Sequence, residues 1–286
     1  MSECGDPGPQ FVSIEGGRYC YRRGGEGRVV LVLHGLTDSS RLVWREFFCR
    51  FEKEYTIVAM DLRGHGDSEK PEDGYAPADQ ARLVAAFIDK LGLDRPVLLG
   101  HSLGGIIAAK FAILFPQRLI GLVICDSPLG AGFWKNLRLA ARLPLKGVAM
   151  VGTTMIPLLG RFMFGLRSPR TMRLLLKSLR LFHDPSHITE VLIEDKMKGT
   201  YEAVTQSLWH TVVFENLFKD LDCISVPTLI IHGSYDSLVP LDLAKRAASK
   251  IPNSRLVLIE KAGHFPMIEQ PNLFNQTVSQ FLSTLE

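Results

Sequence analysis

The chain has 286 residues, of which 46% are hydrophobic and 22% are charged, and its formal net charge at pH 7 is +3. These values are typical of a globular protein with a sizeable core, and they exclude an intrinsically disordered or fibrous chain. A net charge this small does not indicate nucleic-acid binding by the chain as a whole.

The sequence has no feature that indicates secretion or a transmembrane segment. It does not begin with a basic cluster followed by an apolar run, and no apolar stretch reaches the roughly 18 residues of a membrane-spanning helix. Its five cysteines are scattered and form no Cys-x-x-Cys pair, which predicts neither a disulfide framework nor a zinc site. We therefore expect a cytoplasmic protein with no transmembrane segment.

Short apolar runs alternate with helix-like segments over most of the chain. Six runs rich in β-branched residues predict strands that are buried on both faces, at 29–33, 56–60, 97–99, 119–124, 228–231 and 256–259. Four segments have the apolar spacing of a helix or lie where a helix is expected, at 77–91, 103–115, 241–250 and 272–285. This alternation predicts an α/β fold with a central parallel sheet.

Residues 127–221 interrupt the alternation, because they contain helix-like text and no clear strand. We expect them to form a helical cap inserted between two parts of a core domain, 1–126 and 222–286. From Lys135 to Arg180 the cap has ten basic residues and no Asp or Glu. This stretch is interpreted either as a solvated polar face or as a docking surface for an acidic partner, such as an acyl carrier protein, a phosphorylated substrate or an anionic membrane.

The strongest chemical motif is Gly-His-Ser-Leu-Gly at 100–104, which lies between a predicted strand and a predicted helix. A serine on such a sharp turn projects its hydroxyl group away from the sheet, and small residues on either side allow the turn to close. The helix that follows directs amide N–H groups toward negative charge that forms during a reaction. Ser102 is therefore the candidate nucleophile.

A serine hydroxyl becomes nucleophilic when a base removes its proton and an acid orients that base. Asp236 and His264 each lie just past the end of one of the last two predicted strands. The chain order Ser102, Asp236, His264 is that of serine hydrolases whose nucleophile lies on a strand-to-helix turn. Asp126 also follows a predicted strand and is the alternative acid.

An oxyanion formed during acyl transfer needs two backbone N–H donors that point at one position. Leu103, which follows the nucleophile, is expected to supply one donor. Leu36, in the loop after the strand 29–33, is the candidate for the other. His34 is expected to shape this loop through hydrogen bonds and not to act on substrate.

Together these motifs resemble those of the α/β-hydrolase superfamily, and in particular its single-domain serine hydrolases with a helical cap, which are carboxylesterase-like. The motifs that carry the resemblance extend over nearly the whole chain outside the cap and are found at 34–35, 61–68, 100–105, 233–236 and 263–264. The resemblance implies an eight-stranded, mostly parallel sheet flanked by helices, with the cap inserted after the sixth strand. It also implies Ser102 as nucleophile, His264 as base and Asp236 as orienting acid.

Several reactions remain open on this fold. We expect a carboxylic ester or thioester with a small to medium apolar acyl group, cleaved through an acyl-enzyme intermediate. The alternatives are a carbon–carbon bond hydrolase, a relative of cofactor-free haloperoxidases, a methyl esterase acting on a carrier-bound substrate, and a ligand receptor with slow turnover. A serine nucleophile excludes haloalkane dehalogenases and epoxide hydrolases, which use an aspartate.

No cofactor or metal is expected. His183 and His187 have a spacing that would suit a metal on a helix, but Pro185 between them disfavours a continuous helix. The residues that bind the substrate are left unassigned.

Overall fold

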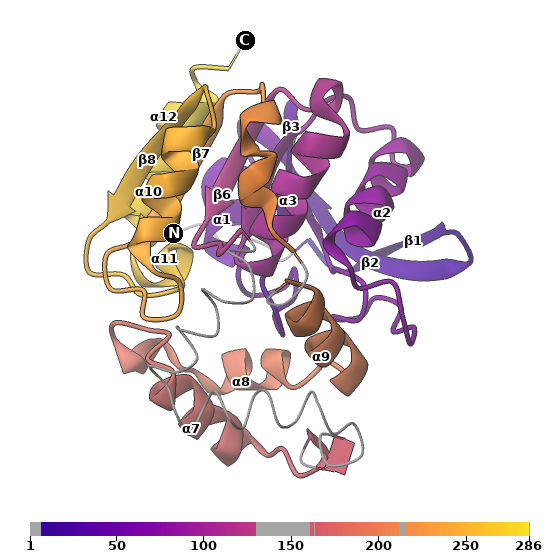
Figure 1. Cartoon of the computed structure of the whole chain (residues 1–286). Helices are drawn as coiled ribbons and strands as arrows, with labels where there is room; N and C mark the ends of the chain where they lie inside the picture. The colour runs from indigo at the N-terminus through magenta and orange to yellow at the C-terminus, as the bar shows by residue number, and fades with distance from the viewer. Residues whose placement is uncertain (1–6, 130–160, 163, 212–214, 286) are drawn as a thin grey trace.

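The centre of the molecule is a sheet of eight strands in the order β1-β2-β4-β3-β5-β6-β7-β8 (Figure 1). The computed structural model describes residues 7–129, 161–162, 164–211 and 215–285. The strands are β1 (Gln10–Ile14), β2 (Gly17–Gly24), β3 (Arg28–Leu33), β4 (Tyr55–Met60), β5 (Val97–His101), β6 (Gly121–Cys125), β7 (Thr228–Gly233) and β8 (Ser254–Ile259). The pairs β1–β2 and β2–β4 are antiparallel, and the remaining pairs are parallel.

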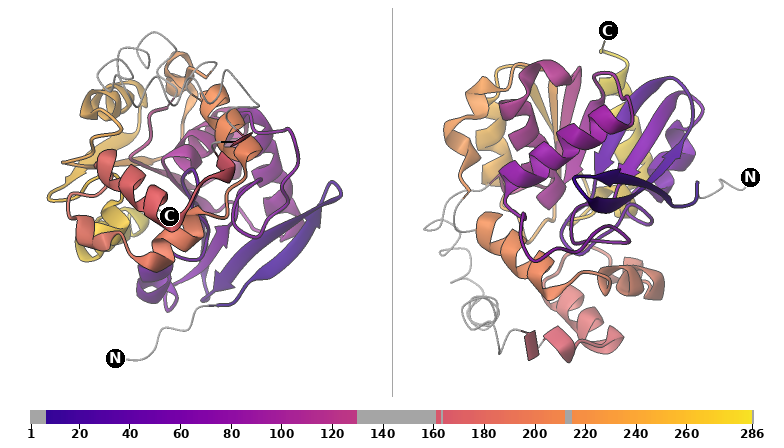
Figure 2. Two further views of the ribbon diagram at one scale, coloured as in Figure 1. Left: turned by 90° about the horizontal axis from the view of Figure 1, so that it is seen from below. Right: turned by 90° about the vertical axis from the view of Figure 1, so that its right-hand side faces the viewer.

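Helices cover both faces of this sheet (Figures 1 and 2). The helices of the core are α1 (Arg45–Phe51), α2 (Pro77–Lys90), α3 (Leu103–Leu114), α10 (Leu241–Lys250), α11 (Pro266–Glu269) and α12 (Pro271–Leu282). Side chains of α2, α3 and α10 belong to one hydrophobic core, and side chains of α1 and α12 belong to another. Successive residues of β3 enter opposite cores, with Leu31 in the first and Val32 in the second. The sheet is therefore buried on both faces, as its apolar strands predict.

The observed elements agree with most of the predicted ones. Strands β3 to β8 lie within two residues of the six predicted runs, and α2, α3, α10 and α12 correspond to the four predicted helices. The sequence analysis assigned no residues to β1, β2 or α1. Both strands belong to the antiparallel part of the sheet. Each contains exposed as well as buried residues, so neither forms a continuous apolar run in the sequence.

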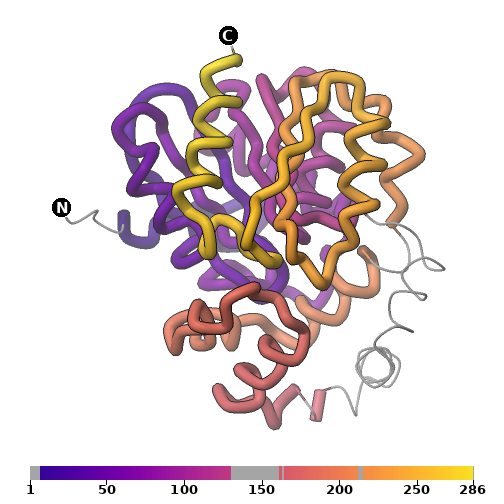
Figure 3. The backbone as a smooth tube through the Cα atoms, turned by 90° about the vertical axis from the view of Figure 1, so that its left-hand side faces the viewer, coloured from indigo at the N-terminus to yellow at the C-terminus, as the bar shows by residue number. Residues whose placement is uncertain are grey.

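The described part of the cap, from residue 161 to 221, is helical and contains no strand. Its α-helices are α7 (Pro169–Ser178), α8 (Glu190–Lys196) and α9 (Tyr201–Trp209). Figure 3 shows this part as one layer at one end of the sheet. The domain boundaries at 127 and 221 stay predictions, and the basic residues Lys135, Arg138, Arg142 and Lys146 lie outside the described residues. Within the described residues, no helix has both the length and the apolar character needed to span a bilayer.

Cys49 is disulfide-bonded, whereas the described cysteines Cys20, Cys125 and Cys223 are free. The spacing of the cysteines in the sequence did not indicate this bond. The cytoplasmic location stays a prediction.

Candidate active site

Ser102 occupies a tight turn between β5 and α3, with φ of 52° and ψ of −113°. Two neighbouring glycines make this turn sterically feasible. A Cβ atom on Gly100 would lie 2.2 Å from the carbonyl oxygen of Gly104, and one on Gly104 would lie 2.6 Å from that of Leu33. The strained backbone at Ser102 is thus maintained by close packing that only glycine permits.

The three predicted catalytic side chains form one hydrogen-bonded row. Nε2 of His264 lies 3.0 Å from Oγ of Ser102, and Nδ1 of His264 lies 2.8 Å from Oδ2 of Asp236. The side chain of His264 is 4% exposed and that of Asp236 is fully buried. With Asp236 accepting from Nδ1–H, the lone pair of Nε2 faces the serine hydroxyl, which is the tautomer that a general base requires.

The Asp236 carboxylate is oriented by a turn of its own. Oδ1 accepts hydrogen bonds from the amides of Leu238 at 2.7 Å and Val239 at 3.0 Å, which leaves Oδ2 for His264. Burial alone would raise the pKa of Asp236, but the neighbouring His264 and these hydrogen bonds outweigh burial and lower the pKa to about 2. Asp236 is therefore ionised near neutral pH.

Asp126, the alternative acid, points to a different set of partners. Its Oδ1 accepts from the amide of Gly233 at 2.9 Å, and the thiol of Cys125 lies 3.2 Å from Oδ2. Burial, followed by the charge of Asp236, raises the pKa of Asp126 well above its usual value. The carboxyl group that faces Nδ1 of His264 is that of Asp236, so the structure brings Asp236 and not Asp126 to the position expected of the orienting acid.

Residues 28–271 match the model of the family described as the alpha/beta hydrolase fold. The chain belongs to this family. An uncharacterised protein of Mycobacterium tuberculosis is 28% identical over 296 aligned residues, which cover 98% of this chain and 82% of the relative. The 2-hydroxy-6-oxononadienedioate/2-hydroxy-6-oxononatrienedioate hydrolase 1 of Pseudomonas putida is 28% identical, and the alignment covers 96% of each chain. A solved esterase structure from Rhodococcus has a TM-score of 0.79 and 25% identity, covering 97% of this chain and 99% of that one.

The two candidate oxyanion donors of this α/β hydrolase lie at the start of α3 and in the loop after β3. Leu103 is the first residue of α3, where amide N–H groups have no acceptor within the helix. Leu36 is half-buried in the loop after β3. That loop is shaped by His34, whose Nδ1 lies 2.7 Å from the Gly35 carbonyl oxygen and whose Nε2 accepts from the Leu62 amide at 3.0 Å. His34 is fully buried and both of its ring nitrogens face backbone groups.

His101 is a positioning residue that the sequence analysis did not identify. Its Nε2 lies 2.7 Å from the carbonyl oxygen of His264, and its ring packs against the rings of His264 and Phe265. Burial lowers the pKa of His101 to about 3, so the ring is neutral and Nε2–H donates this bond. The only signal in the sequence is its position next to the nucleophile.

The cap segment after α7 is hydrogen-bonded to both loops that carry the acid and the base. The amide of His264 donates to the carbonyl oxygen of Leu181 at 2.7 Å. The hydroxyl of Ser237, next to Asp236, donates to the carbonyl oxygen of Leu179 at 2.7 Å. This part of the cap therefore supports the catalytic geometry directly.

Glu269 joins the same cap segment to the loop of the catalytic histidine. Its two carboxyl oxygens accept from the amide of Gly263 at 2.7 Å and from the amide of Asp184 at 2.9 Å. The residue is 7% exposed, and burial raises its pKa. Like His101, Glu269 becomes recognisable as a positioning residue only from contacts between distant parts of the chain.

A second contact between cap and core is a buried ion pair. Lys196 at the end of α8 pairs with Asp38, two residues past Leu36, and their side chains are 2% and 1% exposed. Nζ of Lys196 also lies 4.7 Å from the ring centroid of Phe265. Burial alone would raise the pKa of Asp38, but the Lys196 charge outweighs burial and the pKa is lowered. This ion pair connects α8 of the cap to the loop after β3 that contains Leu36.

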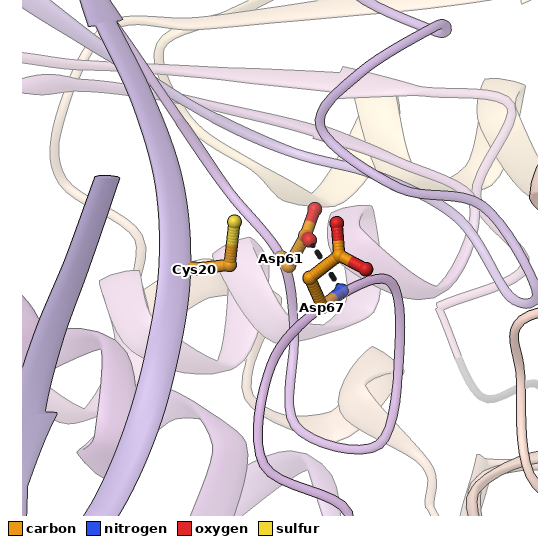
Figure 4. Close-up of side chains that lie close together, drawn as sticks. All are labelled: Cys20, Asp61 and Asp67. Carbon is orange, nitrogen blue, oxygen red and sulfur yellow. Dashed lines mark hydrogen bonds between the residues drawn. The ribbon is translucent and has the colours of Figure 1, made fainter. Parts of the chain in front are cut away.

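Two clusters of acidic, thiol and imidazole groups have spacings that a metal ion would accept. Figure 4 shows the first, Cys20, Asp61 and Asp67, with the Asp61 carboxylate directed at the Asp67 amide. That carboxylate accepts from the amides of Ser40 at 2.6 Å and Asp67 at 2.9 Å, and burial raises the pKa of the Cys20 thiol to about 12. These groups stabilise the turn at 61–68 and do not present free metal ligands.

The second cluster contains Asp126, His232 and Asp236. Both ring nitrogens of His232 face backbone carbonyl oxygens, those of Gly233 at 2.8 Å and Val239 at 3.0 Å. The two carboxyl groups are engaged as described above, so the hydrogen bonds of this cluster hold Asp236 in place. The absence of a metal stays a prediction from the sequence.

Proposed function

We propose that this α/β hydrolase is a serine hydrolase that cleaves carboxylic esters, or thioesters, of small to medium apolar acyl groups. The observation that supports this most directly is the row of hydrogen bonds from Ser102 through His264 to Asp236, with distances of 3.0 and 2.8 Å. Such a row needs no cofactor, because the nucleophile, the base and the orienting acid all belong to the chain.

The reaction follows from this geometry. His264 removes the proton of Ser102 as Oγ attacks the carbonyl carbon, and Asp236 stabilises the imidazolium that results. The amides of Leu36 and Leu103 are proposed to donate to the oxyanion. His264 then protonates the alcohol or thiol leaving group, and a water molecule activated by His264 releases the acid from Ser102.

A carbon–carbon bond hydrolase is the second candidate, since the relatives include hydrolases of meta-cleavage products as well as esterases. The dioate substrate named for the Pseudomonas putida relative carries carboxylates, which need cationic partners. Lys196, the buried cation next to Phe265, is already paired with Asp38. This pairing favours the ester reaction, because freeing Lys196 would leave Asp38 as an unpaired buried charge.

The partner and location assigned from sequence stay proposals: a small-molecule ester substrate, no nucleic acid, an acidic partner at the basic cap, and a cytoplasmic location. A slow receptor on the same fold would differ in turnover and not in structure.

The test is hydrolysis of p-nitrophenyl esters of increasing acyl length by wild type, Ser102→Ala and Ser249→Ala. Ser249 is an exposed serine on α10 and serves as the matched control. We expect activity that Ser102→Ala abolishes and Ser249→Ala leaves unchanged. Activity that survives in Ser102→Ala contradicts the proposal. Hydrolysis of a 2-hydroxy-6-oxo-dienoate without ester hydrolysis replaces it with the carbon–carbon reaction, and a single turnover per chain replaces it with the receptor.

A further inference from the structure

Helix α7 is apolar on its outward face as well as on its inward face. Its inward residues Met172 and Leu176 are buried, but Leu174 is 66% exposed and Leu175 is 47% exposed. Exposed leucines at adjacent positions on a short helix are a costly feature for a surface that faces only water.

The turn before α7 adds two more exposed apolar side chains. Phe162 is 65% exposed and Leu166 is 63% exposed, and the Leu166 amide donates to the Phe162 carbonyl oxygen at 3.2 Å. Together with Leu174, these are the most exposed large apolar side chains of the described residues. Figures 1 and 3 show this turn and α7 at the end of the molecule that is farthest from the C-terminus.

Basic side chains lie among these apolar residues. Arg170 precedes Leu174 by four positions and Lys177 follows it by three, so both are its neighbours on the helix surface. Both are exposed, and within the described part of the chain neither forms an ion pair, whereas Arg173 pairs with Glu190. We call Phe162, Leu166, Arg170, Leu174, Leu175 and Lys177 the cap face.

We propose that the cap face docks the protein on an anionic phospholipid surface. The cap face has exposed leucine and phenylalanine side chains with arginine and lysine between them, and residues 161–183 include no Asp or Glu. This composition is typical of a helix that binds at a membrane interface. An acidic protein would account for the charges alone, whereas a lipid interface also accommodates the exposed leucines without a groove of matching shape. The charge complement of the cap face is therefore an anionic lipid headgroup.

Docking at this face has a consequence for the substrate, and that part rests on the proposed function. The chain leaves α7 and, within three residues, contacts the catalytic loops through Leu179 and Leu181. A protein held by the cap face thus keeps its triad close to the lipid surface, which suits an ester substrate that partitions into lipid.

The experiment is co-sedimentation of the full chain with sucrose-loaded vesicles of phosphatidylcholine alone or mixed with phosphatidylglycerol, at low and high salt. We expect about tenfold or more tighter binding to the anionic vesicles, weakened by salt. Arg170→Glu with Lys177→Glu, and separately Leu174→Ser with Leu175→Ser, should each weaken binding by about tenfold or more. Lys245→Glu and Leu273→Ser, at exposed positions of the core, are the matched controls and should bind as wild type does.

Binding that does not prefer anionic vesicles, or cap-face variants that bind as the controls do, would overturn the proposal. So would binding to an acidic acyl carrier protein with no binding to vesicles. All these variants should hydrolyse soluble p-nitrophenyl acetate at the wild-type rate, which shows that they fold. Ser102→Ala should bind vesicles as wild type does, so that a failure of docking and a failure of the proposed hydrolase activity are distinguishable.

Discussion

The triad loops and the cap face differ in how their side chains are held. Around the triad, His264 and Asp236 are buried and each has hydrogen bonds at both ends of its polar group. On the cap face, Leu174 and Lys177 are exposed and have no polar partner within the described residues. The first arrangement is the preorganised interior that acid–base chemistry requires, whereas the second leaves side chains available for contact with another surface.

The inner part of the cap belongs with the triad loops and not with the cap face. Leu181 accepts from the His264 amide, and Lys196 is buried with Asp38. The boundary between groups that have partners within the fold and side chains that have none therefore runs through the cap, between the inward and the outward sides of α7.

The largest effect is expected from removing the triad acid. Asp236→Asn should lower kcat for ester hydrolysis on the order of 10⁴-fold, because an amide no longer selects the tautomer of His264 that accepts the serine proton. Steady-state kinetics on a p-nitrophenyl ester would measure this loss. Asp126→Asn is the matched control, and its loss should stay below about tenfold because Asp126 binds the Gly233 amide and does not contact His264. A larger loss in Asp126→Asn than in Asp236→Asn would reverse the assignment.

The next effect concerns the buried ion pair between cap and core. Lys196→Met leaves the Asp38 carboxylate buried without a cation and should lower the free energy of unfolding by about 3 to 5 kcal/mol. The double variant Lys196→Met/Asp38→Asn should recover at least half of this loss, because it removes both charges. Urea denaturation measures both values. An unchanged free energy of unfolding in Lys196→Met would show that the ion pair with Asp38 does not stabilise the fold.

The buried histidine His101 predicts a smaller, pH-dependent effect. Its pKa is about 3 in the folded chain and 6.5 as a free group, so the unfolded chain binds the extra proton between these values. Its contribution to stability is complete above pH 6.5 and falls by about 1.4 kcal/mol per pH unit as pH falls through that window. Asp126 titrates in the opposite sense, since its pKa is raised, so the whole-protein slope does not isolate His101.

The measurement is therefore the difference in unfolding free energy between wild type and His101→Gln from pH 7.5 to 5. We expect the difference to stay constant above about pH 6.5 and wild type to lose stability relative to the variant at each step down in pH below that value. A difference that stays constant across this range would show that His101 has the same protonation in both states.

The smallest effect is expected on the outward side of α7. Leu174→Ser should change the free energy of unfolding by no more than about 0.5 kcal/mol, because its side chain is largely exposed. Met172→Ala, two residues earlier and buried, should cost about 2 kcal/mol. Thermal or urea unfolding of the two variants compares the two faces of one helix. Equal losses would show that the leucine contributes to packing and would contradict its assignment to the cap face.

The core of this fold and the row of Ser102, His264 and Asp236 could be predicted from sequence because both depend on local patterns. Apolar runs identify the buried strands, and the turn at Ser102 needs Gly100 and Gly104 whatever the rest of the chain does. Ser102 directly follows β5, and Asp236 and His264 lie in the loops that follow β7 and β8, so their places are determined by chain order and parallel pairing.

The supporting contacts could not be predicted in the same way. Lys196 and Asp38 are 158 positions apart, and the bond from His264 to Leu181 joins a core loop to an irregular cap segment. Nothing in the neighbouring sequence of these residues indicates their partners. The antiparallel strands β1 and β2 could not be predicted for a related reason, since their burial depends on what packs beside them and not on an apolar run.

The central claim is that His264 and Asp236 activate Ser102 as a nucleophile. Mass spectrometry of wild type after treatment with a fluorophosphonate, followed by digestion, locates the residue that becomes phosphonylated. The account predicts one phosphonyl group per chain, on Ser102, and a rate that falls on the order of 10⁴-fold in Asp236→Asn. No modification of folded wild type, or modification at a different residue, would contradict it.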